Sequence, residues 1–157
     1  MVDPESFVLL LAANGTPVVA AWLLGSRVAW PLDAGREFRD GRRLLGAHKT
    51  WRGLVLGIVV AGIAGAAMRI GVSTAAAFGA LALAGDLVSS FFKRRLGRVP
   101  GRESLLLDPL PESVLPMLVL QRQLGLDAAA LLGTTLLFAL LNVTFSRAMT
   151  AFRAGGR

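Results

Sequence analysis

Apolar segments of about twenty residues, separated by two basic loops, are the feature that most limits how this chain can fold. Of the 157 residues, 54% are hydrophobic, and the mean hydropathy is +0.61. A helix needs about 20 apolar residues to cross the hydrocarbon core of a bilayer. The sequence therefore predicts an all-α integral membrane protein with about five transmembrane helices and two long basic cytoplasmic loops, forming a single membrane-embedded domain over residues 1–157. The expected spans lie near residues 6–24, 53–70, 72–92, 113–126 and 128–146.

The fourth of these segments is the weakest, and whether it spans fully stays open. Its apolar part, Val114–Leu120, is short, and prolines, Gln121 and Arg122 surround it. Five spans nevertheless place both basic loops and the C-terminal tail on one side, with nearly all of the 17 Lys and Arg residues. By the positive-inside rule that side faces the cytoplasm. We therefore expect the N-terminus outside, the C-terminus inside, and residence in the cell (inner) membrane.

Composition excludes several kinds of site. The chain has no Cys and one His, so thiolate zinc sites, disulfides and histidine-rich metal sites are ruled out. Any metal must be a hard cation with oxygen ligands, which points to Mg²⁺. The net charge is +7, but the cations lie between apolar segments. That distribution favours anionic membrane lipids over nucleic acid as the partner.

A polar break interrupts the first apolar segment at Asn14-Gly15-Thr16-Pro17. Pro17 removes a backbone donor, so a kink is expected there. Two interpretations of Asn14 stay open. Its amide either bonds the backbone groups that the kink leaves unpaired, or makes an intramembrane polar contact at a reaction centre.

The first basic loop, residues 26–52, ends in a run of glycines, cations and a hydroxyl. Its content is that of a phosphate-binding loop, yet it is not the GxxxxGK[ST] motif, because Ala47-His48 follows Gly46. A solvated loop fits the composition equally well. The candidate nucleotide- or phosphate-binding residues here are Arg42, Arg43, Lys49, Thr50 and Arg52.

Asp86 lies inside the third apolar segment, where an acidic side chain is costly. A charge at this depth costs about 2.5–3.5 kcal/mol even on the lenient insertion scale, so an acid here is expected to serve a function. At spacings of four and three residues, Asp86, Ser90 and Lys93 fall on one helical face. They would line a single polar groove.

The second basic loop, residues 93–113, places cations between carboxylates. The run Lys93–Arg95 begins it, and Asp108 and Glu112 lie near its end. Together with Asp86, these two acids offer the oxygen ligands that Mg²⁺ prefers, while the cations can hold phosphates. This combination beside lipid predicts chemistry on a phosphorylated lipid. Anchoring to anionic headgroups is the alternative interpretation of the basic run.

The residues also indicate what kind of chemistry to expect. No Ser-His-Asp set or Cys-His pair is evident, so a covalent enzyme intermediate has little support. A phosphate monoester is largely dianionic at pH 7 and needs no general base to act as a nucleophile. Metal and cations would then align two anions and stabilise a leaving pyrophosphate.

These segments, taken in order, resemble the CDP-archaeol synthase family, the small relatives of phosphatidate cytidylyltransferases. The matching elements are Phe38–Arg43 with Leu45-Gly46, Lys49–Gly53, Gly85–Leu87, Ser90-Phe91, Lys93–Gly97 and Leu107-Asp108. The resemblance implies transfer of a cytidylyl group from CTP to a lipid phosphate, with Mg²⁺, by a catalytic domain. It further implies Asp86 and Asp108 as metal-associated acids. It implies phosphate contacts from Lys93, Arg94 and Arg95, and a substrate-binding first loop that includes Lys49, Thr50 and Arg52.

One departure from the family pattern leaves alternatives open. Archaeal members read like Asp-x-x-Asp after the leucines, whereas here Asp108-Pro109-Leu110-Pro111 is followed by Glu112. Either Glu112 substitutes for the missing carboxylate, or this branch has lost or altered activity. The rival function is that of a non-catalytic or degenerate relative that binds anionic lipid or nucleotide. A small transporter is a third class, disfavoured because no pair of broken helices recurs in matching halves. The lipid tail, the number of metal ions and the oligomeric state stay open.

Overall fold

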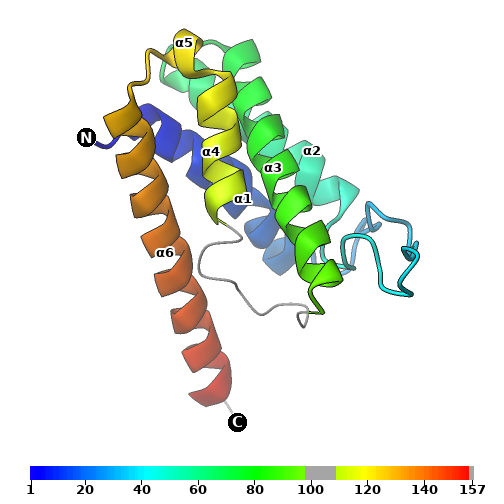
Figure 1. Ribbon diagram of the computed structural model, residues 1–157. Helices are drawn as coiled ribbons and strands as arrows, with labels where there is room; N and C mark the ends of the chain where they lie inside the picture. Colours follow the sequence, from blue (N-terminus) through cyan, green and yellow to red (C-terminus); the bar gives the residue numbers. More distant parts are fainter. Residues whose placement is uncertain (98–108, 156–157) are drawn as a thin grey trace.

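The computed structural model describes residues 1–97 and 109–155, with side chains as far as residue 145. The helices are α1 (Pro4–Leu24), α2 (Trp51–Ala67), α3 (Val72–Arg95), α4 (Pro109–Val119), α5 (Gln121–Leu124) and α6 (Ala128–Gly155) (Figure 1). Besides these helices, the described residues contain only isolated β-bridges, Pro31 with Thr50 and Glu37 with Arg43. The predicted all-α fold is confirmed for this part of the chain.

Among the described residues, three helices are long and apolar enough to cross a membrane: α1, α3 and residues 128–145 of α6. Helix α2 is apolar but shorter, with 17 residues. The predicted fourth span, residues 113–126, is not one continuous helix. Helix α4 has 11 residues, a rise of about 16 Å, and the chain then turns through the four residues of α5. The turn ends at Gly125, whose left-handed conformation (φ 64°) closes α5.

Helix α2 packs with its small residues inward and its large residues outward. The buried positions are Gly53, Gly57, Ala61, Gly62 and Gly65. Val55, Val59 and Ile63, on the opposite face, are each about half exposed or more. This arrangement is the reverse of a soluble amphipathic helix, and it is typical of helices that approach each other closely in a bilayer.

Close approach between helices is visible at individual glycines. A Cβ added to Gly57 would lie 2.7 Å from the carbonyl oxygen of Ala13 in α1, and one added to Gly65 would lie 2.0 Å from Ala75 Cβ in α3. Side chains larger than hydrogen would therefore separate these backbones. The glycine-rich sequence of the second apolar segment is explained by this contact.

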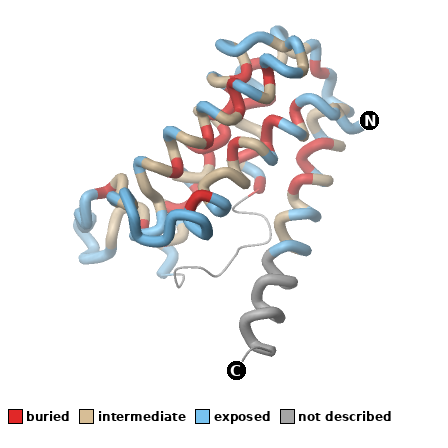
Figure 2. The backbone as a smooth tube through the Cα atoms, turned by 180° about the vertical axis from the view of Figure 1, so that it is seen from behind, coloured by how far each residue is buried: buried red, intermediate tan, exposed pale blue. Residues whose placement is uncertain are grey.

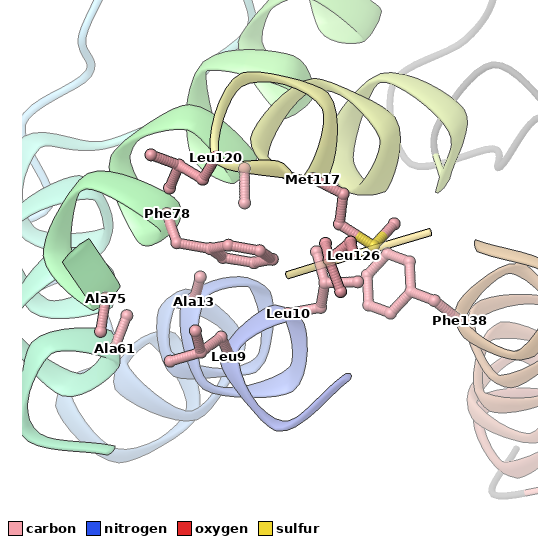
Figure 3. Close-up of a cluster of buried hydrophobic side chains, with 11 residues drawn as sticks. Leu9, Leu10, Ala13, Ala61, Ala75, Phe78, Met117, Leu120, Leu126 and Phe138 are labelled. Carbon is pink, nitrogen blue, oxygen red and sulfur yellow. The ribbon is translucent and has the colours of Figure 1, made fainter. Parts of the chain in front are cut away.

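A small apolar core joins five helices, with Ala61 as the member from α2 (Figure 3). Phe78 of α3 is fully buried, and Leu9 and Leu10 of α1, Met117 of α4 and Phe138 of α6 belong to the same cluster. Figure 2 shows the buried residues along the inner sides of the helices and exposed residues over most of the first loop. The core thus fixes the helices relative to one another on the side away from that loop.

The Asn14 amide bonds to a carbonyl of its own helix, and both of its predicted roles stay predictions. Its Nδ2 donates to the carbonyl of Leu10 at 3.2 Å, and Thr16 Oγ1 donates to the carbonyl of Ala12 at 2.5 Å. Helix α1 continues through Pro17 to Leu24. The side chains thus bond backbone groups of the turn before Pro17, and a contact from Asn14 to a reaction centre stays a prediction.

The helix ends sort onto two sides of the molecule. The C-terminal ends of α1 and α3 and the N-terminal end of α2 lie beside the first loop. Met1 and α5 lie at the other end of the molecule (Figure 1). At that far end the Met1 ammonium donates to the carbonyl of Ala129. We call the end that carries the first loop the site end.

Candidate active site

The first loop, between α1 and α2, is built around the carboxylate of Asp33. Arg43 Nη2 donates to Oδ1 at 2.6 Å, and the backbone N–H of Gly35 donates to the same oxygen at 3.0 Å. The N–H groups of Leu45 and Gly46 donate to Oδ2 at 3.2 and 3.1 Å. Burial alone would raise the pKa of Asp33, but Arg43 and these backbone donors hold it well below the usual value. Asp33 is therefore an ionised internal anchor for the loop.

Arginine side chains attach this loop to the end of α3. Arg95 Nη1 donates to Asp40 Oδ1 at 2.7 Å, and its Nη2 donates to the carbonyls of Arg42 and Arg43 at 3.1 and 2.7 Å. In the reverse direction, Arg42 Nη1 donates to the carbonyls of Arg94 and Arg95 at 3.1 and 3.0 Å. The two basic motifs of the sequence are thus interlocked, each holding the backbone of the other.

Aromatic rings complete the attachment. The Arg95 guanidinium lies 4.8 Å from the ring centroid of Phe38 and 5.1 Å from that of Phe91. The two rings meet edge to face, with centroids 5.6 Å apart. A cation held over aromatic faces in this way is stabilised by the ring quadrupoles. Phe38 from the loop and Phe91 from α3 therefore help to fix the position of the loop.

Asp86 of α3 forms an ion pair with Lys49 of the first loop. The side chains are 19% and 18% exposed, so the pair is largely, but not fully, removed from solvent. Thr50 follows Lys49 and caps α2, since its Oγ1 accepts from the Gly53 N–H at 3.2 Å. The rigid start of α2 therefore holds Lys49 opposite Asp86.

Next to this pair, the last turns of α3 carry buried polar groups. Ser89 and Ser90 are buried, and Arg94 is only 8% exposed. The Nε of Arg94 has no hydrogen-bond partner among the described residues. A buried guanidinium with an unused donor favours an anion as its partner.

The start of α4 lies directly against the turn of α3 that contains Asp86. A Cβ on Gly85 would lie 2.1 Å from the carbonyl oxygen of Pro111 and 2.8 Å from the backbone nitrogen of Glu112. Glu112 is 6% exposed. The backbone contact therefore brings the carboxyl-bearing residues Asp86 and Glu112 onto touching turns. Asp108, predicted as a catalytic and metal-associated acid, lies outside the described residues.

Asp86 and Glu112 are the predicted metal-associated acids that the structure describes. The described residues contain no group of three or more His, Cys, Asp or Glu side chains placed to bind a metal. Mg²⁺ usually takes only one or two carboxylates and completes its shell with water and substrate phosphates. Asp86 and Glu112 as ligands of such an ion stay a prediction.

His48, to which the sequence analysis gave no role, lies beside the ion pair. Burial lowers its pKa, the nearby Lys49 ammonium lowers it further, and the Asp86 carboxylate opposes both effects. The imidazole is therefore mostly neutral at pH 7.

Apart from Thr50, which caps α2, the predicted phosphate-binding residues separate into two groups. Four have guanidinium donors on protein acceptors, and these are Arg42, Arg43, Arg52 and Arg95. Arg52, for instance, donates to the carbonyl of Gly25 at 3.2 Å and also to that of Arg27. Lys49, Ser90, Lys93 and Arg94 lie near Asp86 on α3 or on the adjoining loop. Their contact with phosphate stays a prediction.

Two residues that organise the site, Asp33 and Asp40, were missed by the sequence analysis. Each precedes a glycine with positive φ by one or two positions: Gly35 at 78° and Gly41 at 71°. Asp followed closely by Gly is a turn signal in which the carboxylate bonds a nearby N–H. That signal was available in the sequence, but it does not reveal a buried anchor.

This chain is similar to known proteins of one name. A sequence model of a protein family described as "CarS-like: CDP-archaeol synthase" matches residues 5–74. A CDP-archaeol synthase from Methanosphaerula palustris is 44% identical over 99 residues, covering 54% of this chain and 58% of the relative. One from Aeropyrum pernix is 46% identical over 117 residues, covering 68% and 63%. The chain thus spans about three fifths of the length of these curated relatives.

A solved structure is similar over most of both chains. It is described as "Structural insight into an intramembrane enzyme for archaeal membrane lipids biosynthesis". The TM-score is 0.74 and the sequence identity is 32%, with 89% of each chain covered. Both the helical arrangement and the sequence therefore relate this chain to an intramembrane enzyme.

Proposed function

The chain belongs to the CDP-archaeol synthase family, and we propose that it transfers a cytidylyl group from CTP to a membrane lipid phosphate. The observation that carries this proposal is the Asp86–Lys49 ion pair, which joins α3 to the first basic loop at one end of the helices. Polyanion-binding cations and metal-binding carboxylates therefore belong to a single site. The relatives' shared name favours a prenyl-ether lipid phosphate as the acceptor.

The reaction needs no covalent intermediate on the protein. A phosphate oxygen of the lipid attacks the α-phosphorus of CTP, and a new P–O bond forms as the bond from the α-phosphorus to the bridging oxygen of the β-phosphate breaks. The products are a CDP-activated lipid and pyrophosphate. The attacking dianion is already deprotonated at neutral pH, so none of the residues at the site has to act as a general base.

The residues of the site position and neutralise the two anions. Arg94, buried and with an unused Nε, contacts a phosphate, and Lys93 supports it from the preceding position. Asp86 and Glu112, with Asp108 from outside the described residues, would hold Mg²⁺. When bound, this cation neutralises phosphate oxygens and stabilises the pyrophosphate that leaves. Lys49 is the natural counter-ion of Asp86 before substrate arrives.

The setting is a membrane with the site end facing the cytoplasm, where CTP is available. Three helices have the length and composition to cross a bilayer, and the basic loop lies at the site end. We propose that residues 1–157 act as a single domain. The acceptor's tail would lie among the helices, with its phosphate near Asp86.

Pyrophosphate release tests the activity directly. Purified protein supplied with CTP, Mg²⁺ and either archaetidic or phosphatidic acid should release pyrophosphate, and it should do so faster with the ether lipid. If neither acid led to pyrophosphate release, the proposed catalytic activity would be overturned. Binding of CTP without turnover would instead identify a non-catalytic relative, the alternative that the Pro111-Glu112 departure keeps open.

The ion-pair residue gives a second test with a matched control. Asp86→Asn should lower turnover by about 100-fold or more, as expected for loss of a residue that positions charge in the transition state. Asp127→Asn makes the same chemical change at the far end, where the carboxylate caps α6 by accepting from the Ala130 N–H. It should retain activity. Near-normal turnover in Asp86→Asn would show that Asp86 has no catalytic role.

A further inference from the structure

All three tryptophans of the chain lie at the site end and are exposed. Trp22 is in the last turn of α1, Trp30 is in the first loop, and Trp51 begins α2. Their exposed fractions are 83%, 71% and 53%. Tryptophan is a large, mostly apolar side chain that proteins usually bury to a high degree. Three exposed copies at the site end therefore favour a partner that covers them.

Backbone contacts hold the three positions together. The Trp51 N–H donates to the carbonyl of Trp30 at 3.0 Å, so these two residues lie on adjacent strands of backbone. Arg52, the next residue, donates to the carbonyl of Gly25, three residues after Trp22. The tryptophans thus surround the junction of α1, the first loop and α2. We call them the tryptophan collar.

The surface changes character at the collar. On the helix side lie exposed valines, Val18 and Val19 of α1 and Val55 of α2. On the loop side the exposed side chains include the cations Arg27 and Arg36. Tryptophan is enriched where an apolar surface meets a polar one at a membrane, because its ring is amphipathic and its N–H can bond to headgroups.

We propose that the tryptophan collar docks the site end in the phospholipid headgroup layer of the host membrane. Lys49 lies two residues before Trp51 and is ion-paired with Asp86, so the collar also sets the depth of the site. Asp86 then lies at the level of lipid phosphates and not in the middle of the hydrocarbon. The exposed arginines beyond the collar favour anionic headgroups as the occupants.

Depth-dependent fluorescence quenching tests the docking without any assumption about catalysis. The wild-type protein needs no label, because its only tryptophans are those of the collar. It would be reconstituted in phosphatidylcholine–phosphatidylglycerol vesicles whose acyl chains carry bromine either near the headgroup or near the terminal methyl. Quenching by the shallow bromines should exceed quenching by the deep ones by about twofold or more, as expected for side chains at the interface.

Single-tryptophan variants assign the result to each position. In each variant the other two tryptophans become phenylalanine, and all three reporters should show the shallow preference. The control replaces all three and adds Leu136→Trp, halfway along the apolar part of α6, where the side chain is 69% exposed. Its fluorescence should be quenched more by the deep bromines. Collar fluorescence quenched mainly by deep bromines, or only by aqueous iodide, would overturn the proposal.

A kinetic readout rests in addition on the proposed function. Replacing the three tryptophans by alanine should raise KM for vesicle-borne lipid phosphate several-fold and leave KM for soluble CTP unchanged. An equal rise in both KM values would mean that the collar supports the fold of the loop and does not dock it. If the chain released no pyrophosphate at all, the proposed function would fail while the quenching profile still decided the docking.

Discussion

The carboxylate of Asp33 accepts four hydrogen bonds and sits in the interior of the first loop. Asn at this position keeps the size but loses the charge and one acceptor oxygen. We expect Asp33→Asn to lower the melting temperature, followed by intrinsic tryptophan fluorescence in detergent, and to raise KM for CTP because the loop carries Lys49. Asp127→Asn, an exposed cap at the far end, should change neither quantity.

The pH dependence of this effect follows from the direction of the pKa shift. The folded-state pKa of Asp33 lies below its usual value of 3.8, so its contribution to stability is fully present above pH 3.8. It is lost only as the pH falls below that value. The melting difference between wild type and Asp33→Asn should therefore be constant from pH 8 to pH 5. A difference that shrank between pH 8 and pH 6 would contradict the assignment.

His48 is the chain's only histidine, which makes it an unambiguous NMR probe of the neighbouring ion pair. The Lys49 ammonium lowers the pKa of His48 and the Asp86 carboxylate raises it. We expect Lys49→Met to raise that pKa and Asp86→Asn to lower it, as measured from imidazole carbon shifts in detergent. Shifts in the same direction for both variants would show that His48 does not sense the pair.

Residue types at the site could be predicted from the sequence better than their partners could. Asp86 and Lys49 were both recognised as candidates, yet their pairing depends on how the loop folds across 37 residues of sequence. Arg95 was predicted to contact phosphate, but its donors bond Asp40 and two carbonyls. A guanidinium fork fits a carboxylate, a carbonyl or a phosphate, so composition alone cannot say which acceptor it meets.

At the scale of elements, the contact of α4 with α3 decides whether the acids come together. A Cβ on Gly85 would lie 2.1 Å from the carbonyl of Pro111, and that backbone cannot yield as a flexible side chain would. Gly85→Ala should therefore push α4 away, lower the melting temperature by several degrees and abolish most turnover. The measurements are thermal unfolding followed by fluorescence, and pyrophosphate release.

Gly62→Ala is the matched control for this substitution. Gly62 is also a buried helical glycine, but the nearest atom to an added Cβ there is Val72 Cγ1 at 3.5 Å, an ordinary contact. Since alanine favours helix over glycine by up to about 1 kcal/mol, this variant should be as stable as wild type or more so. If both substitutions lowered the melting temperature and the turnover equally, the close backbone contact between α3 and α4 would not be the cause of the loss.

The helices themselves could be predicted where an apolar run was long enough to span a bilayer, even with a polar residue or a proline inside it. The predicted spans near 6–24, 72–92 and 128–146 correspond to α1, α3 and the apolar part of α6. The prediction of one helix over residues 113–126 was wrong, because the apolar run is short and the chain turns after Val119. Hydropathy measures how apolar a stretch is, and it does not measure where a short helix stops inside a bundle.

At the scale of the whole molecule, the separation of the two ends makes the orientation testable. The chain has no cysteine, so single cysteines can be introduced into it without a background of labelling. With a membrane-impermeant maleimide, Glu37→Cys in the first loop should react only in inverted vesicles, and Gln123→Cys in α5 only in intact spheroplasts. Both residues are exposed. Labelling of both from the same side would contradict the predicted topology.

The buried glycines and the exposed valines of α2 place different limits on which substitutions the two faces of the helix tolerate. Substitutions on the inner stripe are constrained by backbones in contact, while the outer face needs only to remain apolar and of the right length. Lineages with thicker, stiffer or chemically different bilayers can therefore adapt such a protein by exchanging its outer residues alone. The interior stripe, and the loop that it carries, would be inherited almost unchanged.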